Sequence, residues 1–387
     1  MKIVHVYNQL DPRNGGPPHV IAGLVAAQVA AGHEVVLISE DSADETYVDD
    51  FIRNHVGQPI IRHSIQPKLF ISQFTRRQFQ RALDGADIAH LHGVWPIVSM
   101  MASRICRELG VPYVFAPHGS LHRAALMEKA PKKLVGMWAL GYRQYIRDAA
   151  ALHALNQNEA TGAQQPFYSG VSLPAHIEVI PNGVGLEIFE KESNRDAVQT
   201  LIPTLGQAPY ILYLSRLHPG KGCDLLSEAF ARIAMDFPEV HLVFVGQDQG
   251  GQAQAERPIQ KAGLAHRTHF VGPVFDDRKF ALYKSAEVFC LPSRHEGFSM
   301  AITEAMACSC PIVATKTCFF PELTKYDCGV ETEVSASGLA AGLSQVLSNE
   351  AAARAMGDRA HELVRSDYTW PRIAAKTIAL YERCLDN

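Results

Sequence analysis

Two glutamates, Glu296 and Glu304, stand eight positions apart in the stretch SRHEGFSMAITEAM, which begins at Ser293. Gly297 permits a sharp turn of the backbone, and the apolar pattern after it predicts a helix over 298–307. Helical side chains tilt toward the N-terminus, so Glu304 is expected near the start of that helix. Carboxylates on both sides of a helix start suit a ligand that carries hydroxyls as well as an anion.

The backbone at this helix start supplies the complementary groups. N–H groups near Gly297, Phe298 and Ser299 have no partner within the helix and can bind anionic oxygens. Glu296 would hold a polyol from the entry loop, and Glu304 would accept hydrogen bonds from hydroxyls. The alternative is that Glu304 is an exposed helix residue, which its mostly apolar neighbours disfavour: Met300, Ala301, Ala305 and Met306.

A second loop, YLSRLHPGKGCDLL, places Arg216 and Lys221 five positions apart between an expected strand and an expected helix. Two cations at a helix start oppose the helix dipole, so the pattern favours a ligand with more than one negative charge. A diphosphate fits, because arginine offers a planar fork and lysine a point charge. The alternative is a solvated basic loop.

The glycine pair of NQLDPRNGGPPHV follows the first expected strand. Gly15 and Gly16 permit a close approach of the backbone to a ligand, and the helix start after them is a natural seat for an anion. The spacing is not GxGxxG, so the fingerprint of a dinucleotide site is absent. Taken alone, the loop is better interpreted as an ordinary turn.

Two histidines of the first half each stand before a glycine at the end of an expected strand. They are His92 in LHGVW and His118 in APHGSL. A single histidine is usually structural, but two at adjacent strand ends that face one cleft put a functional role on a level with a structural one for His118, and a structural role stays ahead for His92.

Loops of this kind need parallel strands that end where the ligand binds. Apolar strands alternate with helices in both halves of the chain, which predicts two parallel sheets covered on both faces. The first half has expected strands 2–7, 34–39, 88–92 and 113–116 with helices 20–31 and 100–109. The second has expected strands 210–214, 241–245, 269–271, 288–291 and 312–314 with helices 224–237, 280–285 and 298–307.

The chain is too long for one ordinary core, with 387 residues, so two domains are expected. They are a first doubly wound α/β domain over 1–183 and a second over 208–369. The polar, weakly periodic stretch 184–207 is interpreted as a linker, and 370–387 as a last helix.

Composition excludes several classes of function. A net charge of −4 does not suit a nucleic-acid partner. No segment is long and apolar enough to span a bilayer, and the start MKIVHVYNQLDP resembles a short strand, so a cytoplasmic location is expected. The eight cysteines form no CxxC pair. A soft-metal cluster between Cys308 and Cys328 is one interpretation, and small buried apolar side chains are the favoured one.

Taken in order, these loops resemble those of the retaining glycosyltransferases of family 4, which are built on the GT-B fold. The likeness covers most of the chain, and its most specific part is the E-x7-E element in PSRHEGFSMAITEAMA. The other parts are the Gly15–Gly16 loop, the HxHG-like stretch from His90, the His118 loop, VIPNGV from Val179, the Arg216/Lys221 pair, VFVG from Val243, and FVGPV from Phe270.

The resemblance implies a role for each charged residue of the second half. Arg216 and Lys221 would bind the diphosphate of the donor. Glu296 would hold hydroxyls of the donor sugar, and Glu304 would bind the ribose of the nucleotide. Backbone groups would contact phosphate and sugar at Gly297, Phe298 and Ser299.

The remaining roles belong to loops on both domains, which in the GT-B fold face each other across a deep cleft. Gly15 and Gly16 would close over the diphosphate, and His118 would touch the transferred sugar. The loop with Gly272 and Val274 would lie by the base. In that fold the first domain supplies the acceptor, the second binds the nucleotide sugar, and the last helix crosses back to the first domain.

Two positions depart from the family pattern. Ser309 in ACSCP stands where the family usually has glycine. Phe319 and Phe320 in CFFPEL replace a loop that more commonly contains glycine. The second departure concerns the preference for nucleotide or sugar rather than the type of reaction.

The resemblance implies transfer of a hexosyl unit from a UDP-, GDP- or ADP-hexose to an acceptor hydroxyl, with no cofactor and no metal site. The expected setting is bacterial exopolysaccharide, O-antigen or glycolipid assembly, with a saccharide or lipid-linked acceptor. Alternatives are a nucleotide-sugar-binding protein without turnover, a pyridoxal-phosphate phosphorylase, and a sugar-nucleotide epimerase.

Peripheral action at the inner face of the membrane is a further hypothesis, because basic and aromatic residues are interleaved in two stretches of the first half. Solvated helix faces are the alternative. The stretches contribute Phe70, Phe74, Arg76, Arg77 and Arg81, and Arg123, Lys129, Lys132, Lys133, Trp138, Arg143 and Arg147.

Overall fold

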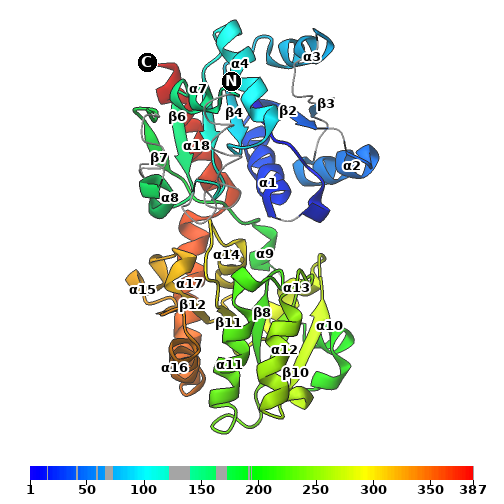
Figure 1. The fold of residues 1–387 in the computed structure, drawn as a ribbon, viewed down its shortest axis with the longest axis vertical. Helices are drawn as coiled ribbons and strands as arrows, with labels where there is room; N and C mark the ends of the chain where they lie inside the picture. Colours follow the sequence, from blue (N-terminus) through cyan, green and yellow to red (C-terminus); the bar gives the residue numbers. More distant parts are fainter. Residues whose placement is uncertain are drawn as a thin grey trace. The chain divides into compact units, whose positions relative to one another are not determined.

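The computed structural model describes residues 1–14, 16–40, 42–57, 60–65, 73–121, 140–162, 172–190, 192 and 194–386. The chain divides into two compact units, of which one is Met1–Gly183 with Trp370–Asn387 and the other is Val184–Thr369. Each unit has its own parallel sheet (Figure 1). The expected pair of doubly wound, Rossmann-like parallel sheets is therefore confirmed.

The first unit has seven strands within the described residues, in the order β3-β2-β1-β4-β5-β6-β7. The strands are β1 (Lys2–Val6), β2 (Glu34–Glu40), β3 (Ile61–Ile65), β4 (Ile88–His92), β5 (Tyr113–Ala116), β6 (Ala151–Ala154) and β7 (Ile177–Val179). The helices are α1 (Gly16–Ala30), α2 (Glu45–Val56), α3 (Gln73–Leu83), α4 (Ile97–Leu109), α7 (Tyr142–Arg147), α8 (Gln157–Gly162) and α18 (Trp370–Leu385).

Both faces of the first sheet are buried. Successive strand residues point to opposite sides of the sheet, and helices cover each side. Val4 of β1 packs in a cluster with Phe79 of α3, while its neighbour Ile3 packs in a cluster with Leu24 of α1 and Tyr381 of α18. Two covered faces explain the nearly continuous apolar sequence of the central strands. Strand β3 lies at the sheet edge and is only half buried, which explains why its sequence, IRHSI, lacks that signal.

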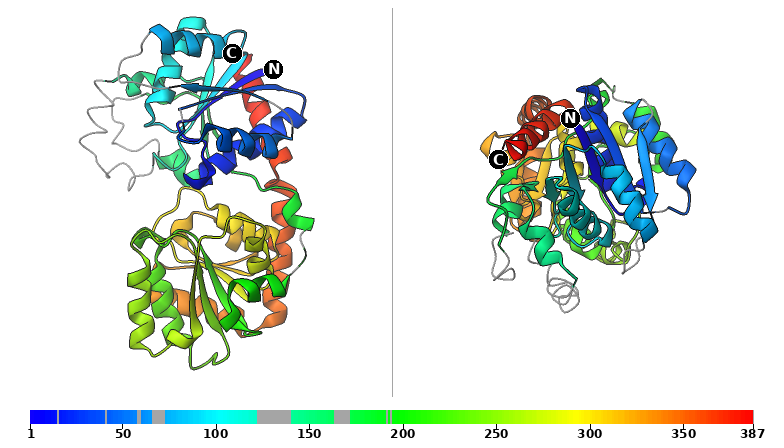
Figure 2. Two further views of the ribbon diagram at one scale, coloured as in Figure 1. Left: turned by 90° about the vertical axis from the view of Figure 1, so that its right-hand side faces the viewer. Right: turned by 90° about the horizontal axis from the view of Figure 1, so that it is seen from above.

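Helix α18 is the last element of the chain and packs beside α1 in the first unit (Figure 2). Its first residue, Trp370, lies against two glycines. A Cβ atom at Gly23 would meet the indole ring at 2.3 Å, and one at Gly183 would meet it at 2.7 Å. These two glycines therefore make room for the indole ring.

The second unit has six strands within the described residues, in the order β10-β9-β8-β11-β12-β13. The strands are β8 (Tyr210–Leu214), β9 (His241–Val245), β10 (Thr268–Gly272), β11 (Val288–Leu291), β12 (Ile312–Thr315) and β13 (Val330–Thr332). The helices are α9 (Glu187–Glu190), α10 (Arg195–Leu201), α11 (Cys223–Ile233), α12 (Gln252–Lys261), α13 (Arg278–Lys284), α14 (Met300–Ala307), α15 (Glu322–Lys325), α16 (Ala336–Leu347) and α17 (Glu350–Asp367).

Residues 184–207, interpreted from the sequence as a linker, carry α9 and α10. Although the stretch is polar overall, Val198, Ile202 and Leu205 are buried in the core of the second unit. Asn194 caps α10 by accepting a hydrogen bond from the N–H of Ala197. These contacts attach the stretch to the second unit.

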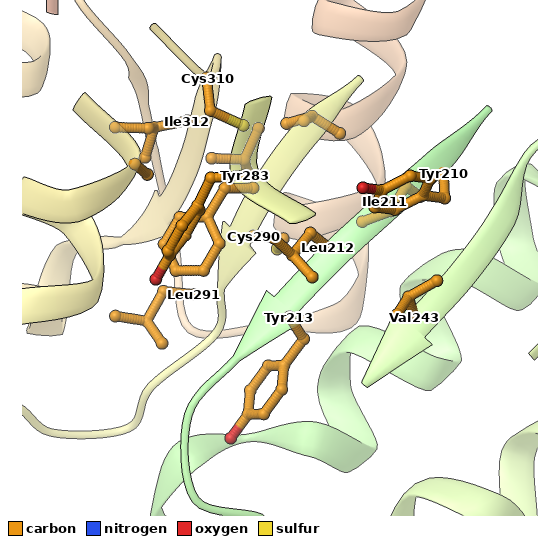
Figure 3. Packing of buried hydrophobic residues seen from close by; sticks show 14 of the residues in the cluster. Tyr210, Ile211, Leu212, Tyr213, Val243, Tyr283, Cys290, Leu291, Cys310 and Ile312 are labelled. Atoms are coloured by element: carbon orange, nitrogen blue, oxygen red, sulfur yellow. The ribbon is translucent and has the colours of Figure 1, made fainter. Parts of the chain in front are cut away.

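The cysteines of the second unit lie among apolar side chains. Figure 3 shows Cys290 and Cys310 in the core with Tyr283, Leu291 and Ile312. Burial raises the pKa of the Cys290 thiol, so the side chain stays a neutral thiol at physiological pH. The interpretation as small buried apolar residues fits this environment.

The contact between α1 and α18 generates a prediction. Gly23→Ala should destabilise the first unit by about 1–3 kcal/mol, because a methyl group would overlap the ring of Trp370. Denaturant unfolding followed by tryptophan fluorescence measures this, since all three tryptophans fall within the residue ranges of the first unit. Ala30→Ser at the exposed end of α1 is the control. Equal stability of Gly23→Ala and wild type would contradict the close packing.

Candidate active site

The charged loops of the second unit lie where its sheet changes direction. Strand order runs outward from β8 on one side and from β11 on the other, so the loops after these two neighbouring strands diverge. In open α/β sheets such a switch point is where ligands bind. Arg216 and Lys221 follow β8, and Glu296 follows β11.

The two loops are held against each other by backbone contacts. The N–H of Arg294 donates to the carbonyl of Gly220 at 2.9 Å. Gly222 has a φ of 71°, and a Cβ atom there would lie 2.0 Å from the carbonyl oxygen of Pro292. Only glycine permits this approach. The guanidinium of Arg294 also grips both carboxylate oxygens of Asp224, at 2.8 and 2.7 Å.

Across this contact, Lys221 and Glu296 form an ion pair. Lys221 Nζ donates to Glu296 Oε1 at 2.5 Å, and the hydroxyl of Ser293 donates to the same oxygen at 2.6 Å. The side chains are 15% and 8% exposed, so little water competes for either charge. The backbone N–H of Glu296 donates to the carbonyl of Thr317. The structure thus brings together two residues that the sequence analysis assigned to separate tasks.

Helix α14 begins at Met300, two residues later than expected, because Ser299 is its N-cap. The Ser299 hydroxyl oxygen accepts a hydrogen bond from the N–H of Ile302. Phe298 turns its ring toward the buried ring of Phe320, with 5.9 Å between the centroids. Gly297 stands between Phe298 and the ion pair. The Phe298 side chain is thus engaged in packing, which leaves its backbone for the ligand role expected of it.

Glu304 is not an exposed helix residue. Its Oε1 accepts from Lys279 Nζ at 2.8 Å, and its Oε2 accepts from the hydroxyl of Tyr283 at 3.3 Å. Burial disfavours the charged form of Lys279, but the carboxylate outweighs this and raises the lysine pKa. Each carboxylate oxygen keeps a further lone pair for a hydroxyl. The sequence analysis missed Lys279, although Lys279 and Tyr283 stand four apart on α13, which places them on one helix face.

The ends of β8, β9 and β10 complete this edge of the sheet. Arg216 is exposed, and its guanidinium makes a long hydrogen bond of 3.3 Å to Gln249. Gly272 ends β10 with a φ of 80° and accepts from the N–H of Gly246 at 2.9 Å. Val274 is half buried against the core. All of these residues sit at the carboxyl end of the sheet, as expected.

The glycine pair of the first unit is described in part. Gly15 lies outside the described residues. Gly16 is the first residue of α1, and nothing lies within 4 Å of a Cβ atom placed there. The helix begins earlier than expected, so Pro17 and Pro18 fall in its first turn, where they carry no N–H. This helix start therefore offers fewer backbone donors to an anion than the sequence analysis assumed.

His118 follows β5 with a φ of 51°, which is unusual for a residue other than glycine. Its Nε2 lies 2.8 Å from Nδ1 of His92, and the N–H of the next residue, Gly119, donates to the buried carboxyl of Glu159. Burial raises the pKa of Glu159 to about 7. Glu159 was not predicted from the sequence. Its position as an acidic residue in the first turn of the short helix α8 is the one feature that could have pointed to it.

The two departures from the family pattern occupy left-handed backbone positions. Ser309 has a φ of 53° and Phe319 a φ of 52°. Glycine adopts this conformation without strain, which explains why glycine suits both positions. The ring of Phe319 packs edge-on against His295, with centroids 6.0 Å apart, in the loop that carries Glu296.

Comparison with known proteins identifies both halves. The family model described as "Glycosyl transferase 4-like domain" matches residues 15–183, and "Glycosyl transferases group 1" matches residues 202–363. The phosphatidyl-myo-inositol mannosyltransferase of Mycobacterium tuberculosis is 27% identical over 96% of this chain and 94% of its own. The GDP-mannose:cellobiosyl-diphosphopolyprenol alpha-mannosyltransferase of Xanthomonas campestris is 25% identical over 100% of this chain and 97% of its own.

Solved structures share the fold. A glycosyltransferase from Rickettsia africae has a TM-score of 0.78 at 16% identity and covers 100% of this chain and 99% of its own. Anabaena HepE in complex with UDP and glucose has a TM-score of 0.77 at 18% identity, covering 99% and 100%. Two Rossmann-like parallel-sheet units with these neighbours define the GT-B fold. The chain belongs to the GT4-type glycosyltransferases.

Acid is expected to destabilise the first unit, because four buried histidines and the partly buried His118 have lowered pKa values there. Burial lowers the pKa of His5 and His153 to about 4 and that of His118 to about 3, and holds those of His90 and His92 well below 6.5. As pH falls below 6.5, only the unfolded chain takes up these protons. Each histidine then removes about 1.4 kcal/mol of stability per pH unit.

Glu159 acts in the opposite direction. Its raised pKa of about 7 means that the folded unit holds a proton which the unfolded chain releases above pH 4.5, so this one group gains stability as pH falls. The stability lost through the five histidines exceeds the stability gained through Glu159 as the pH falls. Thermal unfolding monitored by tryptophan fluorescence should show a lower midpoint at pH 5.5 than at pH 7.5. An equal or higher midpoint at pH 5.5 would contradict the buried, neutral state of the histidines.

Proposed function

We propose that this glycosyltransferase moves a hexosyl unit from a nucleotide-diphosphate sugar to an acceptor hydroxyl with retention of anomeric configuration, in exopolysaccharide, O-antigen or glycolipid assembly of bacteria. The observation that carries the proposal is the Lys221–Glu296 ion pair at the switch point of the second sheet. It fixes an ammonium group beside a helix start, which suits a diphosphate, and a carboxylate next to it, which suits sugar hydroxyls.

Lys221 and Arg216 are held differently in the ligand-free protein, and this suggests that they have different tasks. Lys221 is held in place by Glu296, so its charge is already oriented. Arg216 is exposed and only loosely engaged by Gln249, so its planar fork is free to close on phosphate oxygens. Preorganised charge near a leaving group lowers the barrier as negative charge grows on the diphosphate. We propose that these cations serve in place of a metal ion.

The carboxylates would hold neutral parts of the donor. Glu296 accepts hydroxyls of the sugar, Glu304 accepts hydroxyls of the ribose, and Gly297, Phe298 and Ser299 contribute backbone groups. Both glutamates are engaged by lysine ammonium groups, which suits hydrogen-bond acceptance rather than proton donation. Neither glutamate is therefore assigned the part of a glycosidase acid.

Retention follows if attack and departure use the same face of the sugar. The bond between the anomeric carbon and the phosphate oxygen breaks, and its electron pair stays on the diphosphate. The acceptor oxygen bonds to the anomeric carbon from that side, and its proton passes to the departing phosphate oxygen. No enzyme carboxylate is needed as nucleophile. In the GT-B arrangement Gly15, Gly16 and His118 would contact the donor from the first unit, and Gly272 and Val274 would lie by the base.

A lipid-linked acceptor is supported by two relatives, a phosphatidyl-myo-inositol mannosyltransferase and a cellobiosyl-diphosphopolyprenol mannosyltransferase. Part of the expected basic and aromatic surface is seen on α3, where Phe74 is 72% exposed and Arg77 and Arg81 are also exposed. Phe70 and the residues from Arg123 to Trp138 lie outside the described residues. No described helix has the length and apolarity to cross a membrane.

Lys221→Ala tests the reaction. We expect transfer to fall about 10²–10³-fold, because one oriented donor to the developing charge is lost. A thermal-shift screen with UDP-, GDP- and ADP-sugars first identifies the donor, and transfer to an acceptor extract is then measured with labelled donor.

The control is Arg354→Ala, which breaks an exposed i,i+4 ion pair on α17 in the same unit and should leave turnover unchanged. Wild-type turnover by Lys221→Ala would refute the role of the lysine. Tight donor binding by wild type without transfer or hydrolysis would instead favour the alternative of a nucleotide-sugar-binding protein.

Peripheral membrane contact is tested by co-sedimentation with vesicles of phosphatidylglycerol and phosphatidylcholine. Arg77→Ala/Arg81→Ala should weaken binding by about 2 kcal/mol, at about 1 kcal/mol for each basic residue near an anionic surface. Gln73→Ala, which replaces an exposed neutral residue of the same helix, is the matched control. Absence of wild-type binding to anionic vesicles would contradict the proposal.

A further inference from the structure

Five histidines, Gln28 of α1 and Tyr381 of α18 form one continuous hydrogen-bonded chain inside the first unit. It starts at the carbonyl oxygen of Ile180 and ends at His118. In order, the separations are Ile180 O–His153 Nε2 2.7 Å, His153 Nδ1–His90 Nε2 3.3 Å, His90 Nδ1–Tyr381 OH 2.7 Å, Tyr381 OH–Gln28 Nε2 3.2 Å, Gln28 Oε1–His5 Nε2 2.7 Å, His5 Nδ1–His92 Nε2 2.9 Å and His92 Nδ1–His118 Nε2 2.8 Å.

The hydrogen bond to Ile180 determines which nitrogen of His153 carries the proton. A carbonyl oxygen only accepts, so His153 must carry its proton on Nε2, which faces Ile180. In a neutral imidazole the other nitrogen is then an acceptor. His153 Nδ1 therefore accepts from His90 Nε2, and His90 Nδ1 is in turn an acceptor.

The same logic passes through the two helices. The hydroxyl of Tyr381 donates to His90 Nδ1, so its oxygen must accept from the Gln28 side-chain nitrogen. Thr377 imposes the same orientation independently. Its hydroxyl donates to the carbonyl of Ala374, so at 3.4 Å it is an acceptor for the same Gln28 nitrogen. The carbonyl oxygen of Gln28 thus faces His5.

Beyond Gln28 the direction is again determined. Gln28 Oε1 accepts from His5 Nε2, His5 Nδ1 accepts from His92 Nε2, and His92 Nδ1 accepts from His118 Nε2. Every histidine in the chain carries its proton on Nε2. His118 is last, and its Nδ1 is left with a lone pair. Among the described residues this nitrogen has no hydrogen-bond partner.

We propose that this chain locks His118 in one neutral tautomer, so that its Nδ1 is an obligate hydrogen-bond acceptor for a hydroxyl of the donor sugar. Gln28 and Tyr381 are positioning residues, which act on the sugar contact through the histidines. The sugar part rests on the proposed function, whereas the tautomer lock does not. A lone pair repels phosphate oxygens, so His118 discriminates a sugar hydroxyl from the diphosphate.

The surroundings support a neutral chain. The six side chains other than His118 are 3% exposed or less, and burial lowers the pKa values of the histidines. The backbone at His118 is held by the contact between Gly119 and Glu159. Ligand nitrogens of His5, His90 and His92 also lie within 4.8 Å of one another, a spacing that a metal ion could bridge. Their nitrogens are already engaged in mutually consistent hydrogen bonds, which favours the chain over a metal ion.

Nitrogen-15 NMR of the ligand-free protein with labelled histidine tests the lock directly, since the nitrogen shifts separate protonated from lone-pair nitrogens. We expect five neutral rings protonated at Nε2, with no titration between pH 8 and pH 6.5. His118→Asn assigns the His118 signals. Protonation of His118 at Nδ1, a mixture of tautomers in wild type, or stoichiometric bound metal in the purified protein would overturn the proposal.

Two variants distinguish the effect of the hydrogen bonds on the His118 tautomer from an effect of side-chain packing. Gln28→Met keeps the volume but removes the acceptor for His5, so His5, His92 and His118 should become tautomer mixtures. Tyr381→Phe removes one link, yet Thr377 still orients Gln28, so signals of His90 and His153 should change while His118 keeps its tautomer. An unchanged His118 in folded Gln28→Met would overturn the role of Gln28. The wild-type spectrum decides the proposal even where a variant does not fold.

The sugar contact is tested by adding UDP-glucose or GDP-mannose, with UDP and GDP as controls that lack the sugar. A bound nucleotide sugar should shift the His118 Nδ1 signal without protonating it, and the nucleoside diphosphates should not. A bound nucleotide sugar that leaves Nδ1 unmoved, or an equal shift with UDP alone, would overturn the sugar contact. Failure of transfer with an intact tautomer pattern would fault the proposed function and leave the lock standing.

Discussion

The arrangement of the two charged loops in the second unit depends on one ion pair placed in a poorly hydrated position. Lys221 and Glu296 come from loops after different strands, and each would be costly to bury without the other. Keeping them paired requires the two loops to touch, which in turn requires the glycine at 222 and the Arg294 contacts. Removing either member would leave a charge with little water around it. The same demand that fixes the loops thus orients both groups for a ligand.

The two units place different kinds of polar group at the ends of their strands. Around β8 and β11 the second unit collects full charges, in the Lys221–Glu296 and Lys279–Glu304 pairs. At the ends of β1, β4 and β5 the first unit collects neutral imidazoles whose charge is suppressed by burial. An ammonium group suits a diphosphate, whereas carboxylates and neutral imidazoles suit hydroxyls.

Sequence patterns predicted the central strands and the loops that follow them, because strands buried on both faces are continuously apolar and their loops break with Gly and charged residues. They did not predict β3, which is half buried at an edge, nor β6 and β7, which are four and three residues long. The residues that hold the site residues in place were harder to predict. Lys279, Glu159 and Gln28 lie far along the chain from the residues they hold, and only the fold brings them together.

Helix α18 has a consequence for how the protein is made. Its residues Ile373, Leu380 and Tyr381 complete a core that also contains Ile3 and Leu24, yet they leave the ribosome after the whole of the second unit. Until they emerge, α1 covers this part of the core without its partner helix, and the apolar side chains that α18 would bury lack that contact. The core of the first unit is therefore completed by residues that follow the second unit in the chain, so its folding cannot finish before the second unit has been synthesised.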